Sequence, residues 1–279
     1  MPALVTDHYE QKLDADTIIR QLQEAYPNGP NQFQLAPVDQ LHIGGIKASL
    51  KLIERIGELK PNSVLDIGSG LGGLMRLVGD KLDLQIIGLD ITHPLNHINQ
   101  RLSALNDENP TPALITGDAH HLPFPDKQFD LIVFQHSLLN MPDATQVLSE
   151  CKRILSAEGS ILLHEVLEGP NHSNIKYPVP WARSADSSHL RSQKELETLI
   201  QEAGFKIDFF SDWSQDALSW RKRQSEKEQQ AKDSGQATQP PVSPALILGP
   251  EFGQMGTNVM RNLGSEAARV VEVLARSIG

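Results

Sequence analysis

The chain has 279 residues, a formal net charge of −10 and a single cysteine, Cys151. This length allows one large hydrophobic core with an appendage. One cysteine excludes an intramolecular disulfide framework and fits a reducing compartment. The acidic balance disfavours nucleic acid and acidic membranes as partners, and no apolar run is long enough to span a bilayer. We therefore expect a cytoplasmic protein that binds neither nucleic acid nor membrane.

Two helical patterns precede the first predicted strand. Residues 14–26 form an amphipathic pattern that ends in a Pro/Gly/Asn-rich loop, and a second pattern covers residues 45–59. Residues 1–60 are therefore predicted to be a helical cap.

Residues 64–73, V-L-D-I-G-S-G-L-G-G, are the strongest motif. A short apolar strand containing Asp66 runs into a glycine-rich turn, where the backbone can approach a ligand because glycine has no Cβ. Gly68, Gly70 and Gly73 match the dinucleotide fingerprint G-x-G-x-x-G, which is weak evidence alone. A carboxylate at Asp66 repels a pyrophosphate but attracts the ammonium and sulfonium of S-adenosylmethionine (SAM). The motif therefore favours SAM over NAD.

Short apolar strands alternate with helical patterns from about residue 64 to residue 210. The strands read V-L-D-I, Q-I-I-G-L, A-L-I-T, L-I-V-F and S-I-L-L-H-E, with helices such as 144–155 and 193–203 between them. This alternation predicts an open parallel sheet that binds ligands at the carboxyl ends of its strands. The polar residues at these ends are Asp66, Asp90, Asp118, Gln135 and His136.

Four motifs follow one another along the chain: D-I-G-S-G, L-D-I-T, G-D-A and F-D-L-I-V-F-Q-H. With these motifs in this order, the chain resembles the class I SAM-dependent methyltransferases. The resemblance is closest to small-molecule enzymes of the ubiquinone/menaquinone and sarcosine/dimethylglycine type. The resemblance covers about residues 35–210. It implies an α/β, Rossmann-like fold with a seven-stranded, mostly parallel sheet and helices on both faces. The implied segments are a cap (1–60), a SAM-binding core (61–212) and a C-terminal extension (213–279).

The resemblance also assigns roles at the glycine turn. Asp66 would hold the methionine ammonium of SAM, directly or through water. Gly68 and Gly70 would let the chain pass beside the cofactor. Ser69 stands where the family often has cysteine, and its backbone contacts should persist.

Other roles follow at the next strand ends. Asp90 would take both ribose hydroxyls, and Ile91 would lie against the adenine. Asp118 would accept the adenine amine, with Ala119 beside the ring. Gln135 would lie near the methionine portion.

Three residues are candidates for the methyl-acceptor side. His136 is the first candidate for a general base, because histidine accepts a proton near neutrality, although it could merely hydrogen-bond at the strand end. His42 belongs to a segment that the resemblance places over the cofactor, and its alternative is a surface histidine beside a helix cap. Trp181 lies in a long proline-bounded loop and either contacts substrate or packs in the core. His164 and Glu165 are weaker candidates.

We expect no metal site. His120 and His121 are adjacent and therefore point in different directions, and no cysteine or third histidine stands at ligand spacing.

The C-terminal part predicts a mobile polar linker around residues 232–243, then a closing strand or turn and a terminal helix. Apolar residues recur at helical spacing in the last segment and would dock on the domain or on a second subunit of a homodimer. These residues are Leu263, Ala267, Val270, Val271 and Leu274.

These features predict a SAM-dependent methyltransferase with a small-molecule acceptor. The leading acceptor is an amine or amino-acid derivative, which would be methylated on nitrogen. The alternatives are O- or C-methylation of a phenol, quinone precursor or natural product, SAM binding without catalysis, and, least favoured, a nicotinamide-dependent dehydrogenase.

Overall fold

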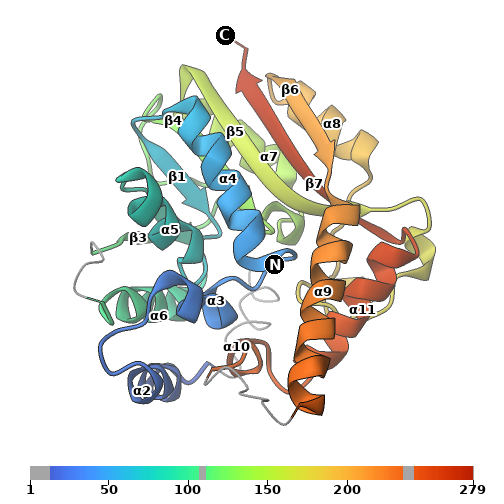
Figure 1. Cartoon of the computed structure of the whole chain (residues 1–279). Coiled ribbons are helices and arrows are strands. Elements are labelled where there is room, and N and C mark those ends of the chain that lie inside the picture. The colour runs from blue at the N-terminus through green and yellow to red at the C-terminus, as the bar shows by residue number, and fades with distance from the viewer. Residues whose placement is uncertain (1–12, 107–110, 235–241, 279) are drawn as a thin grey trace.

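A seven-stranded sheet organises the molecule (Figure 1). The structure is a computed structural model that describes residues 13–106, 111–234 and 242–278. The strand order is β3-β2-β1-β4-β5-β7-β6. The strand β7 runs antiparallel to both of its neighbours, β5 and β6, whereas all other pairs of neighbouring strands are parallel. The predicted mostly parallel, Rossmann-like sheet is confirmed. The strands are β1 (Val64–Ile67), β2 (Ile87–Asp90), β3 (Ala113–Thr116), β4 (Phe129–Gln135), β5 (Leu155–Glu168), β6 (Phe205–Asp212) and β7 (Ala268–Ser277).

Helices cover both faces of the sheet, as expected. In Figure 1, α4 and α5 lie in front of the sheet and α7 lies behind it. The helices are α2 (Ala15–Ala25), α3 (Gln32–Asp39), α4 (Gly45–Leu59), α5 (Gly73–Leu82), α6 (His93–Ser103), α7 (Ala144–Ile154), α8 (Gln193–Glu202), α9 (Ser214–Asp233), α10 (Ala245–Leu248) and α11 (Phe252–Gly264). Short 3-10 turns are η1 (Leu138–Asn140), η2 (His172–Asn174) and η3 (Ala185–Ser187).

Alternation along β4 shows how the sheet is buried on both sides. Leu131 and Val133 pack into the cluster formed with α4 and α5. Ile132 and Phe134 pack into the opposite cluster, which α7 and α8 cover. Successive side chains of a strand point to opposite faces, so a strand with two covered faces is apolar throughout.

The N-terminal helices pack beside the sheet. Asp14 caps α2, because its Oδ1 accepts a hydrogen bond from the Thr17 amide at 3.1 Å. The helix α3 was not predicted. It begins with a reciprocal capping box between Asn31 and Gln34, within the stretch that proline, glycine and asparagine mark as a loop.

The predicted terminal helix is wrong. Residues 268–277 form β7, which pairs with both β5 and β6 and supplies the sheet with its seventh strand. Val270, Val271 and Val273 are each at most 1% exposed. A strand buried on both faces is continuously apolar, so its residues also satisfy a helical spacing by chance. The terminal part of the sequence therefore belongs to the sheet, while α11 occupies residues 252–264.

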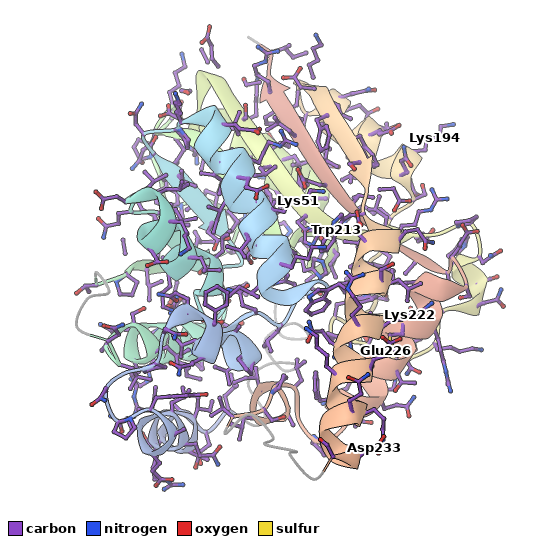
Figure 2. The ribbon with its side chains drawn as sticks, viewed as in Figure 1. Lys51, Lys194, Trp213, Lys222, Glu226 and Asp233 are labelled. Carbon is purple, nitrogen blue, oxygen red and sulfur yellow. The ribbon has the colours of Figure 1, made fainter. Side chains whose placement is uncertain are left out.

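The long helix α9 connects β6 to the C-terminal part. Figure 2 shows its polar side chains Lys222, Glu226 and Asp233 along the helix. Trp213, which precedes α9, is 3% exposed and lies against Lys51, whose Nζ is 5.6 Å from a ring centroid. The predicted linker around residues 232–243 falls largely outside the described residues. No helix in the described part of the chain has the length and apolar character needed to cross a membrane.

Candidate functional site

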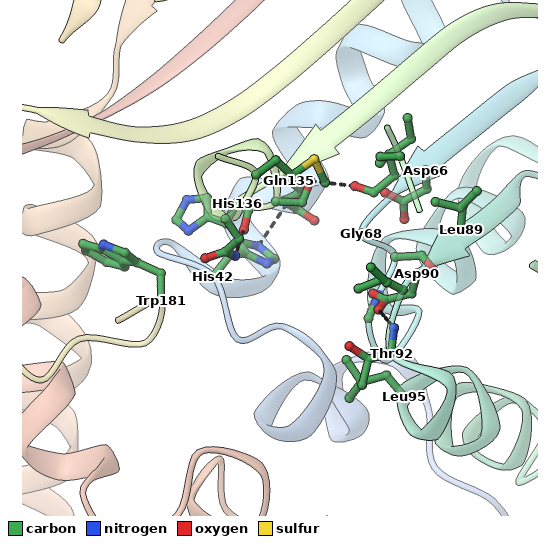
Figure 3. Close-up of a pocket in the computed structure, with 18 of the residues that line it drawn as sticks. His42, Asp66, Gly68, Leu89, Asp90, Thr92, Leu95, Gln135, His136 and Trp181 are labelled. Carbon is green, nitrogen blue, oxygen red and sulfur yellow. Dashed lines mark hydrogen bonds between the residues drawn. The ribbon is translucent and has the colours of Figure 1, made fainter. Parts of the chain in front are cut away.

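A cavity of about 720 Å³ lies at the carboxyl ends of the central strands (Figure 3). All of the site residues predicted from the sequence line it, except the two weaker candidates His164 and Glu165. The predicted residues that line it are His42, Asp66, Gly68, Ser69, Gly70, Asp90, Ile91, Asp118, Ala119, Gln135, His136 and Trp181. In Figure 3 the acids Asp66 and Asp90 lie on one side, and His42, His136 and Trp181 lie on the other.

The glycine turn after β1 requires left-handed backbone. Gly68 has a φ of 78° and Gly70 a φ of 52°, conformations that side-chain-bearing residues rarely adopt. A Cβ added at Gly68 would lie 2.4 Å from the Cβ of Ser137, whereas one at Gly70 would have no atom nearer than 4.0 Å. Gly68 therefore permits close packing, and Gly70 leaves open space beside the backbone.

Asp90 ends β2 and is fixed by the turn. Its Oδ2 accepts the Gly70 amide at 2.9 Å, and its Oδ1 accepts the Thr92 amide at 2.8 Å. Burial nevertheless raises the pKa of Asp90 above its ordinary value. The carboxylate is thereby oriented, and the Thr92 side chain also hydrogen-bonds to it, which leaves part of its acceptor capacity for a hydroxyl of a ligand.

Asp66 is a buried acid whose ionised form lacks a positively charged partner among the described residues. It is 3% exposed, and burial, reinforced by the nearby charge of Asp90, raises its pKa to about 7. A buried carboxylate is costly when ionised without a partner. A cationic ligand in the cavity would relieve that cost.

Asp118 follows β3 and is held by the next residues. Its Oδ1 accepts the His120 backbone amide at 2.9 Å and lies 2.6 Å from His120 Nδ1. Partial burial acts to raise the pKa of Asp118, but these hydrogen bonds outweigh it and lower the pKa. Asp118 is therefore an ionised acceptor at neutral pH, and His120 is its partner.

Ser69 contributes to the cavity through its backbone. Its side chain packs toward β2, since a Cβ added at Gly88 would lie 2.7 Å from Ser69 Oγ. That hydroxyl is buried and has no hydrogen-bond partner among the described residues.

Gln135 is held in a buried polar network. Its Nε2 donates to Ser49 Oγ at 3.0 Å and lies 3.1 Å from His42 Nε2. Ser49 in turn donates to Gln40 Oε1 at 2.6 Å, and His42 Nε2 lies 2.9 Å from the Gly45 carbonyl. Burial and the neighbouring His164 lower the pKa of His42 to about 3, so the ring is neutral.

His136 turns into the cavity from the end of β4. Its φ is 55°, and its ring stacks on His164 with centroids 5.0 Å apart. Burial, then the charges of His164 and His42, lower its pKa well below the ordinary value. The histidine is therefore neutral, but it is a weaker base than an exposed histidine.

His164 and Glu165 do not line the cavity. Glu165 accepts the backbone amides of Ser137 and Leu138 at 2.9 and 2.8 Å and so holds the turn that follows His136. Burial raises the pKa of Glu165 to about 7 despite these bonds. Both residues act behind the cavity wall.

Trp181 packs in the core, which was one of its two alternatives, and it also borders the cavity. It packs in a core cluster with Val179, Trp213 and Val259 and is 6% exposed. It also lines the cavity beside Pro180. Its exposed fraction is small, so it offers a wall rather than an open aromatic face.

Comparison with known proteins identifies the family. A methyltransferase-domain family model matches residues 65–163. The demethylmenaquinone methyltransferase of Thermotoga maritima is 30% identical over 182 residues, covering 57% of this chain and 76% of that protein. The chain belongs to the class I SAM-dependent methyltransferases. Phosphoethanolamine N-methyltransferase 2 of Caenorhabditis elegans is 28% identical over 58% of this chain, but this chain spans only 37% of that protein.

Solved structures of methyltransferases share the fold. Phosphoethanolamine N-methyltransferase 2 of Haemonchus contortus matches 98% of this chain and 59% of its own at a TM-score of 0.72 and 17% identity. A sarcosine dimethylglycine methyltransferase described as putative, from Galdieria sulphuraria, matches 95% of this chain and 99% of its own at 0.67 and 17%. The family, shown by the matching domain model and the Thermotoga maritima relative, sets the dehydrogenase alternative aside.

This methyltransferase uses SAM, and its cavity fits that cofactor. A cation would stabilise the ionised form of the buried Asp66. Gly70 leaves space beside the backbone, and hydrogen bonding orients the carboxylate oxygens of Asp90. These three features fit, in turn, the ammonium group, the methionine chain and the ribose hydroxyls of SAM.

Several cavity residues of the methyltransferase were missed from the sequence. Ile247 and Leu248 of α10 form part of the wall, although the sequence marked that region only as a strand or turn. Asp39 at the end of α3 also lines the cavity and pairs with Arg76 at 2.8 Å. No local signal links these positions to the strand ends, because they reach the cavity through tertiary packing.

Proposed function

We propose that the strand-end acids bind SAM in the order that the sheet presents them. Asp66 takes the methionine ammonium, Asp90 takes the ribose hydroxyls and Asp118 accepts the adenine amine. Ile91 and Ala119 lie against the adenine ring. The observation that carries this proposal is that all five residues line one cavity at the carboxyl ends of β1 to β3.

The methionine portion then lies along the turn. The backbone of Gly68, Ser69 and Gly70 passes beside it. Gln135 borders it and is held rigid by Ser49 and His42. A preorganised neighbour aligns the methyl group without an ordering cost at the moment of reaction.

The methyl acceptor enters at the end that His42, His136 and Trp181 line. SAM supplies a methyl group that its sulfonium activates for in-line displacement. The protein's task is to align the nucleophile and exclude water, which supplies on the order of 7–11 kcal/mol. His136 accepts a proton when the nucleophile arrives protonated, and its low pKa keeps it neutral and available over a wide pH range.

The names of the relatives support more than one choice for the acceptor atom that receives the methyl group. Nitrogen remains the leading choice, supported by names such as ajmaline N-methyltransferase of Rauvolfia serpentina. Oxygen is the second choice, supported by the 27-O-demethylrifamycin SV methyltransferase of Amycolatopsis mediterranei.

We also propose the setting in which the enzyme acts. Its net charge of −10 and single buried thiol fit a cytoplasmic enzyme without a nucleic-acid partner. A homodimer is proposed as its assembly, and light scattering measures it directly.

Label transfer tests the proposed function. The protein is incubated with methyl-labelled SAM and a panel of amines, phenols and quinone precursors. Label appearing in one acceptor class supports the proposal and identifies the atom. Tight SAM binding with no transfer to any class would favour the non-catalytic alternative.

A further inference from the structure

The cavity divides into a charged end and an uncharged end. The carboxylates of Asp66, Asp90 and Asp118 belong to the proposed cofactor end. No lysine or arginine lies among the described residues that line the cavity. An acceptor bearing a phosphate or carboxylate would therefore meet neither a lysine nor an arginine among these described residues.

The two remaining acids of the described lining are an ion-paired residue and a solvent-exposed one. Asp39 is paired with the buried Arg76 at 2.8 Å, and both side chains are at most 3% exposed. Asp143 caps α7 by accepting the Gln146 amide at 3.1 Å, and it is exposed to solvent. Beyond the cofactor end, an ammonium-bearing acceptor would thus meet, among the described lining residues, only one carboxylate that is paired with an arginine and one that is open to solvent.

The wall at the acceptor end is apolar where a tight turn reaches the cavity. Pro180 and Trp181 lie at the tip of a tight turn, in which Val179 and Ala182 exchange backbone hydrogen bonds of 2.8 and 3.1 Å. Ile247 and Leu248 of α10 line another part of the cavity and are each 8% exposed, and Ile247 packs in one cluster with Leu71 and Leu95.

Two buried asparagines on α11 hold that turn. Asn262 binds Lys176 twice, because its Oδ1 accepts the backbone amide at 2.8 Å and its Nδ2 donates to the carbonyl at 3.0 Å. Asn258, one helical turn earlier, donates to the Pro178 carbonyl at 3.0 Å. Both asparagines are at most 2% exposed. The segment that contains α10 and α11 therefore lines part of the cavity through Ile247 and Leu248. It also holds the turn of Pro180 and Trp181 in place through Asn258 and Asn262.

We infer that this end of the cavity is an acceptor subsite for an uncharged molecule with an apolar body, and that Asn258 and Asn262 are positioning residues for its wall. The inference rests on the proposed function, because it assigns the cofactor to the acidic end. It narrows the leading amine class, since a zwitterionic amino-acid derivative or a phosphorylated amine lacks partners at this wall. A neutral amine, a phenol or a quinone precursor meets the same wall without leaving a charge unpaired.

Binding of matched probes tests the acceptor class. The protein loaded with S-adenosylhomocysteine is titrated at pH 7 with 2-naphthol, sarcosine and phosphoethanolamine. We expect 2-naphthol to bind at least tenfold more tightly than either charged compound. Comparable or tighter binding of a charged compound, or no binding of 2-naphthol, would overturn the inference. Failure of S-adenosylhomocysteine itself to bind would instead contradict the proposed function and remove the basis of the inference.

Substitutions then test the wall. Asn262→Ala should weaken 2-naphthol binding about fivefold to tenfold and leave S-adenosylhomocysteine affinity within twofold. Thr257→Ala is the matched control on the same helix, because Thr257 bonds only to its own helix at the Gly253 carbonyl. Leu248→Glu places a charge in the lining of the cavity and should weaken 2-naphthol binding at least tenfold. Unchanged 2-naphthol affinity in both Asn262→Ala and Leu248→Glu would show that the probe lies elsewhere.

Discussion

At the residue scale, Asp66 links cofactor binding to pH. Its pKa is raised to about 7 by burial and by Asp90. Below that pH the carboxyl is protonated and neutral, and above it the carboxylate attracts a cation. SAM affinity should therefore rise between pH 6 and pH 8, by several-fold, and level off above that range.

Calorimetry at pH 6, 7 and 8 measures this dependence. Asp66→Asn should bind SAM more weakly than the native protein at pH 8 and should lose most of the pH dependence. A native affinity that stays flat over this range would mean that Asp66 does not face the ammonium.

The lowered pKa of His136 predicts a different dependence of activity on pH. Its pKa lies well below the ordinary value, so activity should not fall near pH 6.5 as it does when an exposed histidine protonates. His136→Ala should slow turnover at least tenfold if His136 accepts the proton, because general bases contribute about 10²–10⁴-fold. SAM affinity should stay within about twofold. An unaltered rate in this variant would remove His136 from the mechanism.

The acids of the candidate site were predictable at this scale because each lies at or near the carboxyl end of its own strand. Asp66, Asp90 and Asp118 need only the strand pattern and the general position of ligands in parallel sheets. The roles of Ile247 and Asn262 were not predictable, since neither has a chemical signature and both act through distant segments.

At the element scale, β7 is the strand on which the sheet depends. It lies between β5 and β6, and Val273 in its middle is 0% exposed. Val273→Asp would bury a charge without a partner, a cost of several kcal/mol against a total stability of about 5–15 kcal/mol. We expect this variant to be unfolded or to melt far below the native protein.

Thermal unfolding measures the effect of Val273→Asp. Arg276→Ala on the same strand is the control, because Arg276 is exposed and its pairing with Asp208 at 3.1 Å is at the surface. Native-like melting of Val273→Asp would contradict the central place of β7.

Helices with a clear start and stop were predictable from the sequence. Asp14 and Ser192 both cap helices near the predicted positions. The terminal strand was not, because a continuous apolar run does not distinguish a doubly buried strand from a helix. The choice between them is made by the gap between β5 and β6, which is a property of the assembled sheet.

At the scale of the whole molecule, the N-terminal helices pack against the segment that contains α10, although the two lie far apart in the chain. Val242 and Ile247 pack in one cluster with Leu22 of α2 and Ile98 of α6. Figure 1 shows α10 near α3 on the same side of the sheet. The core thus positions the cofactor residues, and the flanking segments line other parts of the cavity. Sequence patterns identify the first part, while the second depends on contacts between segments far apart in the chain.

The most direct test of the account is a calorimetric titration of the native protein and Asp90→Ala with SAM, S-adenosylhomocysteine and NAD. The account predicts micromolar binding of both sulfur ligands and no binding of NAD. Asp90→Ala should bind SAM at least tenfold more weakly, because hydrogen bonds to a charged group contribute about 1.5–3 kcal/mol each. Binding of NAD, or normal SAM affinity in Asp90→Ala, would contradict the assignment of this cavity.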